Sequence, residues 1–275
     1  MSQTSPSPKS HGRYIFAAGE AAAERLRLLD RIFNPTTREL LTNVGLDTGW
    51  RVADIGCGIG LNALWMAKRV GPSGWVAGVD LSEEQMRIAS ANAETAGIKN
   101  VLFQQGTATQ PWLPRGEFDL VYSRFLLCHL MDPVAALEEM SSLLKPGGVL
   151  VCEDFIASTI KTYPETRAYV RLSEIYPIMD AKRGVNSDAG ASLHRYFQST
   201  GFRSPEIAMK QPAFLRGEEK RFWEVTLREA MPAIVEAGVA RKEDLEQICD
   251  EMRTIADDDT ILLTVATVVQ AWARK

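Results

Sequence analysis

Short apolar runs recur through the middle of the chain, and each one ends at glycine or at small polar residues. Five such runs lie at 51–55, 75–80, 101–108, 118–123 and 143–151. An apolar run of helical length follows the first strand at 61–70, and another helix is expected to begin near Glu83. Runs that are apolar without alternation are typical of strands buried on both faces of a parallel sheet. The pattern therefore predicts an α/β domain built on such a sheet.

A tail and two helices are expected before the first of these strands. Residues 1–12 contain Ser, Pro, Lys and Gly with almost nothing to bury, which predicts a mobile tail. Apolar residues recur at helical spacing from Gly19 to Phe33. Asn34 and Pro35 then predict the start of a second helix, to about Val44, with Asn as its cap and Pro in its first turn. We expect residues 13–45 to form an N-terminal helical lid.

Two segments interrupt the alternation of strands and helices in the second half of the chain. The first, 156–190, places tyrosines and a methionine among charged residues. A helix over 191–200 and a strand from about 203 to 210 follow it. The second, 217–256, has the pattern of two amphipathic helices, and a β-branched run over 261–269 predicts the last strand. We therefore expect a sheet domain made of 46–155 and 191–275, with helical lid insertions at 156–190 and 217–256.

A glycine-rich turn joins the first strand to the helix over 61–70, in the sequence Asp54-Ile55-Gly56-Cys57-Gly58-Ile59-Gly60. Three glycines in five residues remove the side chains that would hold a ligand away from the backbone. The N–H groups at the start of the next helix face the same gap. The turn therefore predicts a cofactor site, and a tight turn that touches no ligand is the plain alternative.

This turn alone does not identify the cofactor, because such turns serve nicotinamide dinucleotides, flavins and S-adenosylmethionine. The pattern G-x-G-x-x-G fails at Leu61, although Gly58-x-Gly60-x-x-Ala63 meets the looser form that ends in Ala. Asp80 ends the second strand, where a carboxylate can accept hydrogen bonds from both hydroxyls of an adenosine ribose. NAD and S-adenosylmethionine both contain that ribose, so both remain open at this point.

Five motifs follow one another along the chain: DIGCGIG, VDLS, GTA, FDLVYSRFLLCHL and LLKPGGVL. Their order and spacing resemble the class I S-adenosylmethionine-dependent methyltransferases, especially the small-molecule enzymes of ubiquinone and menaquinone biosynthesis and their natural-product relatives. The resemblance covers about 14–155. It implies an α/β fold with a doubly wound, seven-stranded, mostly parallel sheet, the Rossmann-like methyltransferase fold, whose last strand is antiparallel. It also implies S-adenosyl-L-methionine as cofactor and methyl transfer as activity.

The resemblance further implies a set of cofactor-binding residues at the matching positions: Tyr14, Asp54, Gly56, Gly58, Gly60, Asp80, Leu81, Met86, Gly106, Thr107, Ala108, Ser123 and Arg124. Thr107 departs from the acid that is commoner in the family, so the adenine amine would meet its hydroxyl or a backbone carbonyl. Met86 stands where the family packs an apolar residue on adenine, and ordinary core packing is equally open. Asp80 would otherwise cap the next helix, which Ser82 can do itself.

Methyl transfer from a sulfonium needs mainly alignment, because the methyl group is already activated and the nucleophile attacks in line behind it. A base is required only when the acceptor is protonated as it attacks. His129 is the best candidate, because it follows the fourth strand, whose carboxyl end opens onto the ligand crevice. A histidine that only packs a helix is the alternative. Tyr14 is a second candidate, as a phenol that folds over the cofactor or touches the acceptor.

The acceptor class follows from motifs that are missing and from aromatic residues in the lids. Enzymes that methylate exocyclic amines carry an Asn/Asp-Pro-Pro-Tyr run after the fourth strand, where this chain has Ser123-Arg124-Phe125-Leu126. Cys128 follows Leu127 instead of the proline found in cytosine-C5 enzymes. Aromatic side chains offer walls for an apolar ligand: Phe125, Phe155, Tyr169, Tyr176, Phe222 and Trp223. We expect a small, largely apolar aromatic or terpenoid-like acceptor, in secondary metabolism.

Composition and charge exclude several classes of partner and site. The 275 residues carry 31 Lys and Arg against 35 Asp and Glu, a net charge of −4, so no overall positive field attracts nucleic acid or an anionic membrane. The 4 cysteines show no C-x-x-C pairing, which predicts reduced thiols and a cytoplasmic protein without a metal site. No membrane span is expected. An NAD(P)-dependent oxidoreductase and a non-catalytic cofactor-binding protein remain alternatives, and the acceptor atom and a homo-oligomeric state stay open.

Overall fold

The computed structural model describes residues 20–275 and contains one large sheet of seven strands. The strands are β1 (Arg51–Ile55), β2 (Trp75–Asp80), β3 (Val101–Gln105), β4 (Phe118–Arg124), β5 (Leu144–Ile156), β7 (Glu206–Lys210) and β10 (Thr267–Arg274). Their order is β3-β2-β1-β4-β5-β10-β7. β1 pairs in parallel with β2 and β4, whereas β10 is antiparallel to β5 and β7. The predicted mostly parallel sheet with an antiparallel last strand is confirmed.

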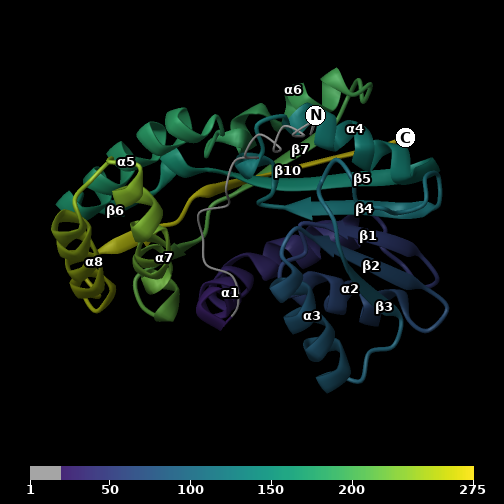
Figure 1. Ribbon diagram of the computed structural model, residues 1–275, viewed down its shortest axis with the longest axis horizontal. Coiled ribbons are helices and arrows are strands. Elements are labelled where there is room, and N and C mark those ends of the chain that lie inside the picture. The colour runs from purple at the N-terminus through teal and green to yellow at the C-terminus, as the bar shows by residue number, and fades with distance from the viewer. Residues whose placement is uncertain (1–19) are drawn as a thin grey trace, which may run out of the picture.

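Helices cover both faces of this sheet (Figure 1). On one face, α2 (Leu61–Val70) and the C-terminal half of α1 (Glu20–Asn43) pack their apolar side chains on β1, β4 and β5. On the other face lie α4 (Pro133–Leu143) and α6 (Leu193–Ser199). α3 (Glu83–Thr95) packs against β2 and β3. Because both faces are covered, the strands of the sheet centre are apolar without alternation.

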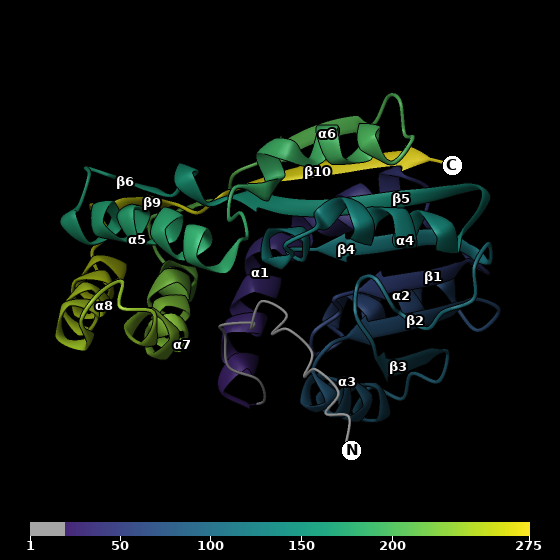
Figure 2. The same cartoon turned by 45° about the horizontal axis from the view of Figure 1, so that its top comes forward.

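A helical lobe lies beyond the carboxyl ends of β4 and β5 (Figures 1 and 2). It contains α5 (Arg167–Arg183), α7 (Phe222–Glu236) and α8 (Lys242–Ala256), with a small antiparallel sheet of β6 (Lys161–Tyr163), β9 (Leu262–Thr264) and β8 (Ala213–Phe214). Short 3-10 helices lie between these elements: η1 (Leu127–His129), η2 (Ala157–Thr159), η3 (Ala189–Ser192) and η4 (Glu218–Arg221). The apolar cluster of the lobe includes Leu28, Ile32 and Phe33, so α1 connects the lobe to the sheet domain.

The prediction of two helices before β1 was wrong, because α1 is one helix with Pro35 inside it. Proline lacks the N–H that would bond to the carbonyl one turn earlier, and this usually ends or kinks a helix. Here the side chains on both sides of Pro35 are buried, with Phe33 2% and Leu40 3% exposed, so tertiary packing holds both halves in one helix. Asn34 is not a cap, and its Oδ1 accepts a hydrogen bond from Arg124 instead.

The prediction of one strand over 261–269 was also wrong. The run divides into β9, in the small sheet of the lobe, and β10, in the large sheet, and the buried residues Val265 and Ala266 lie between them. β10 continues past the apolar run through Gln270, whose Nε2 donates to Glu153 Oε2 at 2.8 Å. In the sequence, a polar residue such as Gln270 marks the end of an apolar strand. In the structure it lies inside β10, because its side chain is buried and hydrogen-bonded.

None of the helices within residues 20–275 has the length and apolar character needed to span a membrane.

Candidate functional site

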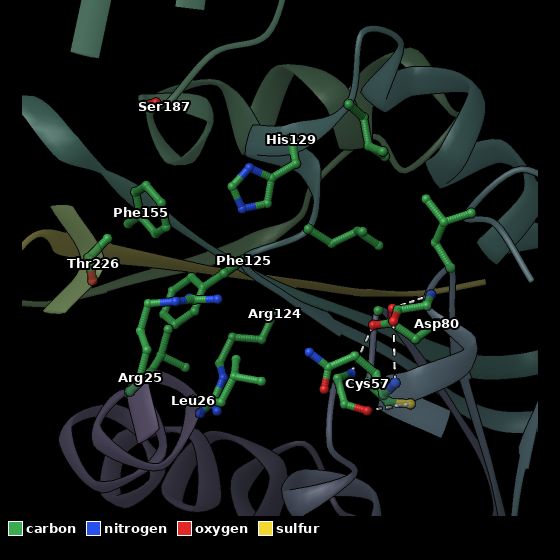
Figure 3. Close-up of a pocket in the computed structure, with 18 of the residues that line it drawn as sticks. Arg25, Leu26, Cys57, Asp80, Arg124, Phe125, His129, Phe155, Ser187 and Thr226 are labelled. Atoms are coloured by element: carbon green, nitrogen blue, oxygen red, sulfur yellow. Dashed lines mark hydrogen bonds between the residues drawn. The ribbon is translucent and has the colours of Figure 1, made fainter. Parts of the chain in front are cut away.

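A cavity of about 340 Å³ lies where the carboxyl ends of β1, β2 and β4 meet the helical lobe (Figure 3). Its lining has two parts, which we name the sheet end and the lobe end. The sheet end comprises Asp54, Gly56, Cys57, Gly58, Asp80, Leu81, Gly106, Thr107 and Ala108. The lobe end has largely apolar walls, formed by Leu29, Phe125, Phe155, Leu172, Ile175, Tyr176, Met179, Phe222, Trp223 and Leu227, and it also includes Arg25, His129 and Arg183.

The glycines of the turn after β1 serve different purposes. Gly56 and Gly58 have φ of 76° and 54°, in the left-handed region that favours glycine. A Cβ atom at Gly58 would meet only Leu26 Cδ1, 3.7 Å away, so this residue faces open cavity. A Cβ atom at Gly60 would lie 2.6 Å from the ring of Phe103 on β3, and Gly60 does not line the cavity. Gly58 leaves room for a ligand, whereas Gly60 is required by packing.

Asp80 ends β2 and lies beside the glycine turn (Figure 3). Its Oδ2 accepts a hydrogen bond from Gly58 N at 2.9 Å, and its Oδ1 accepts one from Ser82 N at 3.0 Å. Burial raises the pKa of this carboxyl, and the hydrogen bonds from Ser82 and Gly58 oppose that rise. Ser82 Oγ caps α3 by accepting from Gln85 N, so Asp80 is not the cap. The remaining lone pairs of its two oxygens can accept ligand hydroxyls.

Asp54 lies at the end of β1 and is 2% exposed. Its Oδ2 is buried and has no hydrogen-bond partner among residues 20–275. Burial raises the pKa of Asp54 to about 7, the charge of Arg124 opposes this rise, and the charge of Asp80 adds to it. A buried carboxylate oxygen without a donor is costly unless a ligand supplies one. The ammonium group of a ligand is a donor of matching charge.

Arg124 follows Ser123 at the end of β4 and reaches the cavity from the side of α1. Its NH1 donates to Asn34 Oδ1 at 2.9 Å and to Thr37 Oγ1 at 3.1 Å, and its NH2 lies 3.5 Å from Asp30 Oδ1. These contacts attach the guanidinium to α1.

A buried polar network continues from this point into the sheet. Thr37 Oγ1 and Tyr122 Oη each donate to Glu153 Oε1 at 2.7 Å, and Gln270 Nε2 donates to Glu153 Oε2. Glu153 therefore links α1, β4 and β10, and it fixes the helix that carries part of the cavity wall.

His129 enters the lobe end from η1 (Figure 3). Burial lowers the pKa of His129 to about 3, and the positive charges of Arg183 and Arg25 lower it further. The imidazole is therefore neutral at pH 7 and a weak base. Arg25 and Arg183 line the same cavity, although neither is among the site residues that the sequence predicts. Each is one charged residue among several on a helix, so no motif marks it.

Residues 52–148 match the family described as a methyltransferase domain. The demethylmenaquinone methyltransferase of Staphylococcus aureus is 31% identical over 131 residues, which are 48% of this chain and 54% of that protein. Residues 52–148 therefore form a methyltransferase domain of this family. The chain spans about half the length of the curated relatives that it matches.

Solved structures share the fold of this methyltransferase domain. A methyltransferase-like protein from Bacillus halodurans superposes with a TM-score of 0.57 at 19% identity, over 86% of this chain and 97% of that chain. The [4+2]-cyclase SpnF superposes with a TM-score of 0.53 at 21% identity, over 97% of this chain and 85% of that chain. At such identities the likeness concerns the fold alone.

The remaining predicted site residues of the methyltransferase domain divide into two groups. Leu81, Gly106, Thr107 and Ala108 line the sheet end, and the Thr107 hydroxyl already accepts a hydrogen bond from Gln110 N at 2.9 Å. Three others do not line the cavity. Gly60 packs on β3, Met86 is buried at 6% exposure with Gln85 lining the cavity in its place, and Ser123 Oγ donates to Cys152 Sγ.

The aromatic wall residues are placed as expected with one exception. Phe125, Phe155, Tyr176, Phe222 and Trp223 line the lobe end, whereas Tyr169 is buried in the core of the lobe and does not. Tyr14, predicted to bind the cofactor or the acceptor, lies outside the described residues.

Proposed function

We propose that this protein transfers the methyl group of S-adenosyl-L-methionine to a small, largely apolar acceptor with an aromatic or terpenoid-like body, in secondary metabolism. One observation carries the proposal. One cavity joins a glycine turn, the buried carboxylate of Asp54 and the half-buried carboxylate of Asp80 at its sheet end to an apolar chamber at its lobe end. Such a cavity can hold a polar, cationic cofactor and an apolar acceptor side by side.

The residues of the sheet end fit this cofactor. Asp80 would accept hydrogen bonds from the ribose hydroxyls, and the unpartnered Oδ2 of Asp54 would accept one from the methionine ammonium. Gly58 lets the ligand approach the backbone closely. Leu81 and Ala108 supply apolar surface for the adenine. When bound, the cofactor supplies a methyl group activated by a sulfonium.

The protein's own part in the reaction is to position the acceptor and to exclude water. α1, α5 and α7 surround the lobe end, so an acceptor held there is desolvated and kept against the sheet end. Its position after β4 makes His129 a candidate general base, but its lowered pKa disfavours that role. We therefore propose that the neutral imidazole orients the acceptor through a hydrogen bond.

The open lobe end also bears on the alternatives. A non-catalytic cofactor-binding protein is expected to have this chamber filled by side chains, and here it is open. We further propose that the protein acts in the cytoplasm on small molecules, because its 4 cysteines are free thiols and its net charge is −4.

Calorimetry with S-adenosylhomocysteine and with NADH tests the cofactor. We expect binding of the first and none of the second, and the reverse result would assign the protein to the oxidoreductases. A screen for cofactor consumption against phenols, indoles, quinols and amines then tests the activity. Tight cofactor binding with no product from any acceptor would favour the non-catalytic alternative.

A further inference from the structure

The lobe end of the cavity contains two arginines beside its apolar walls. Arg25 reaches it from α1, and Arg183 reaches it from the last turn of α5. Figure 3 shows the guanidinium of Arg25 and the imidazole of His129 directed into the same part of the cavity. Because the surroundings are largely apolar, the two positive charges are poorly screened by water.

Two acids near these arginines are hydrogen-bonded within the protein. Asp180 lines the cavity, but it accepts hydrogen bonds from Ser187 N at 2.6 Å and from Ser187 Oγ at 2.7 Å. Glu229 accepts from Arg25 Nε at 2.8 Å and does not line the cavity. The positive field of both arginines reaches the His129 ring, since both lower the pKa of that ring. At the His129 ring, the charges of the two arginines therefore outweigh those of the nearby acids.

The same chamber contains a buried hydrogen-bond donor that has no acceptor among the described residues. Trp223 lines it and is 3% exposed, and its buried Nε1 has no acceptor among the described residues. A buried indole N–H without an acceptor is costly unless a ligand supplies one. The indole N–H and the two guanidinium charges both favour a ligand group that accepts hydrogen bonds and is negatively charged.

We propose that the acceptor molecule carries an ionised oxygen acid on its apolar body, a phenolate, enolate or carboxylate, and that Arg25 and Arg183 bind this oxyanion with Trp223 as a further donor. The inference rests on the proposed function, because it takes the lobe end as the acceptor site. It also removes the need for a base at His129. When the oxyanion attacks, its lone pair forms the oxygen–carbon bond, the carbon–sulfur bond breaks toward sulfur, and no proton moves.

Binding of a matched pair of probes tests the charge preference. The protein is saturated with S-adenosylhomocysteine and titrated with 2-naphthoate and with 2-naphthamide, which have nearly the same shape and differ in charge. We expect 2-naphthoate to bind at least about tenfold more tightly. A third probe, 2-naphthol, separates the two sources of oxyanion. Ionisation of bound naphthol at a lower pH than free naphthol indicates a phenolate site, and a preference confined to naphthoate indicates a carboxylate site.

Variants at the arginines test which residues bind the charge. Arg183→Gln should weaken 2-naphthoate binding about tenfold and leave binding of 2-naphthamide and S-adenosylhomocysteine unchanged. Arg171→Gln, on the same helix but outside the cavity lining, is the matched control. Arg25→Gln leaves Glu229 buried without its partner, so Arg25→Lys is the second variant. Arg25→Lys keeps the positive charge but loses the planar guanidinium with its paired donors. Arg27→Gln, on the same helix, is its control.

Equal affinity for 2-naphthoate and 2-naphthamide in the presence of S-adenosylhomocysteine would overturn the inference and leave the proposed function standing. Failure of S-adenosylhomocysteine to bind would reject the proposed function itself. The two failures are therefore distinguishable within one set of titrations.

Discussion

Asp54, which is buried, and Asp80, which is half-buried, lie at the carboxyl ends of neighbouring parallel strands, β1 and β2. Burial is the largest cause that raises the pKa of each carboxyl, and the charge of Asp80 adds to the rise at Asp54. Burial therefore favours the protonated form of both carboxyls. A cationic ligand group beside Asp54 reverses the balance, because it favours the ionised carboxylate.

We predict that the affinity for S-adenosylhomocysteine rises with pH through the Asp54 pKa of about 7. Below that pKa the carboxyl holds a proton that the ligand ammonium must displace, so affinity should fall about tenfold for each pH unit. Above it the carboxylate is already ionised, and the dependence should level off. Calorimetric titration on both sides of the pKa measures the slope. Asp54→Asn should flatten it, and a wild-type affinity that does not change with pH would rule out this role for Asp54.

The glycine turn permits a second prediction at the same scale. Gly58→Ala places a Cβ atom at a left-handed φ and into the cavity. Gly97→Ala places one at a similar φ, +67°, where nothing lies within 4 Å. Each change should lower the free energy of unfolding by about 1 kcal/mol, because L side chains disfavour this conformation. Only Gly58→Ala should also weaken binding of S-adenosylhomocysteine, measured by calorimetry. An equal loss of affinity in both variants, or in neither, would mean that the turn does not hold the cofactor.

At the scale of elements, Lys220 holds part of the lobe together. Its side chain is fully buried, and its Nζ donates to the backbone oxygens of Leu215, Asp258 and Ile261 at 3.1, 2.6 and 3.0 Å. The ammonium therefore joins the segment before α7 to the segment between α8 and β9. Three donors meet three carbonyls, so the group is satisfied without a carboxylate partner.

We predict that Lys220→Met lowers the free energy of unfolding by about 2–4 kcal/mol, because the methionine leaves three backbone carbonyls without the donor that they share. Urea unfolding monitored by circular dichroism measures the change. Lys242→Met is the matched control, since the side chain of Lys242 is 65% exposed and its ion pair with Glu246 lies on the surface. Such pairs contribute little, so the control should change stability by less than about 1 kcal/mol. Similar losses in both variants would contradict the role given to Lys220.

The elements that the sequence predicts well are those whose signal is local. The apolar strands, the glycine turn and the acid at the end of β2 each lie within a few residues, and the structure places Gly58 and Asp80 side by side. Pairings between distant segments have no such signal. In the sequence Gln270 is only a polar residue, and its hydrogen bond to Glu153 is visible only in the structure. Arg25 is likewise one of several arginines, and only the structure places it at the cavity. The helix break expected at Pro35 failed because burial on both sides outweighs a local preference.

At the scale of the whole molecule, the cavity is shared between two bodies with different sequence character. The sheet domain supplies the turn and the carboxylates, and the lobe, with α1, supplies the apolar walls and the arginines. Because separate elements line the two ends, cofactor affinity and acceptor choice should vary independently when either end is changed.

The last prediction uses this division and two tyrosines of the lobe. Tyr176 lines the cavity and packs edge-on to Trp223, with ring centroids 6.0 Å apart. Tyr163 is 54% exposed on β6 and does not line it. With an acceptor found in the screen, Tyr176→Ala should change its KM by about tenfold or change the preferred acceptor, while the affinity for S-adenosylhomocysteine moves by less than about twofold. Tyr163→Ala should leave both unchanged. Asp80→Asn should give the opposite pattern, with weaker cofactor binding and the same order of acceptors. If Tyr176→Ala methylates every acceptor as the wild type does, the lobe end is not the acceptor site, because a side chain removed from the wall must alter the fit of whatever the wall encloses.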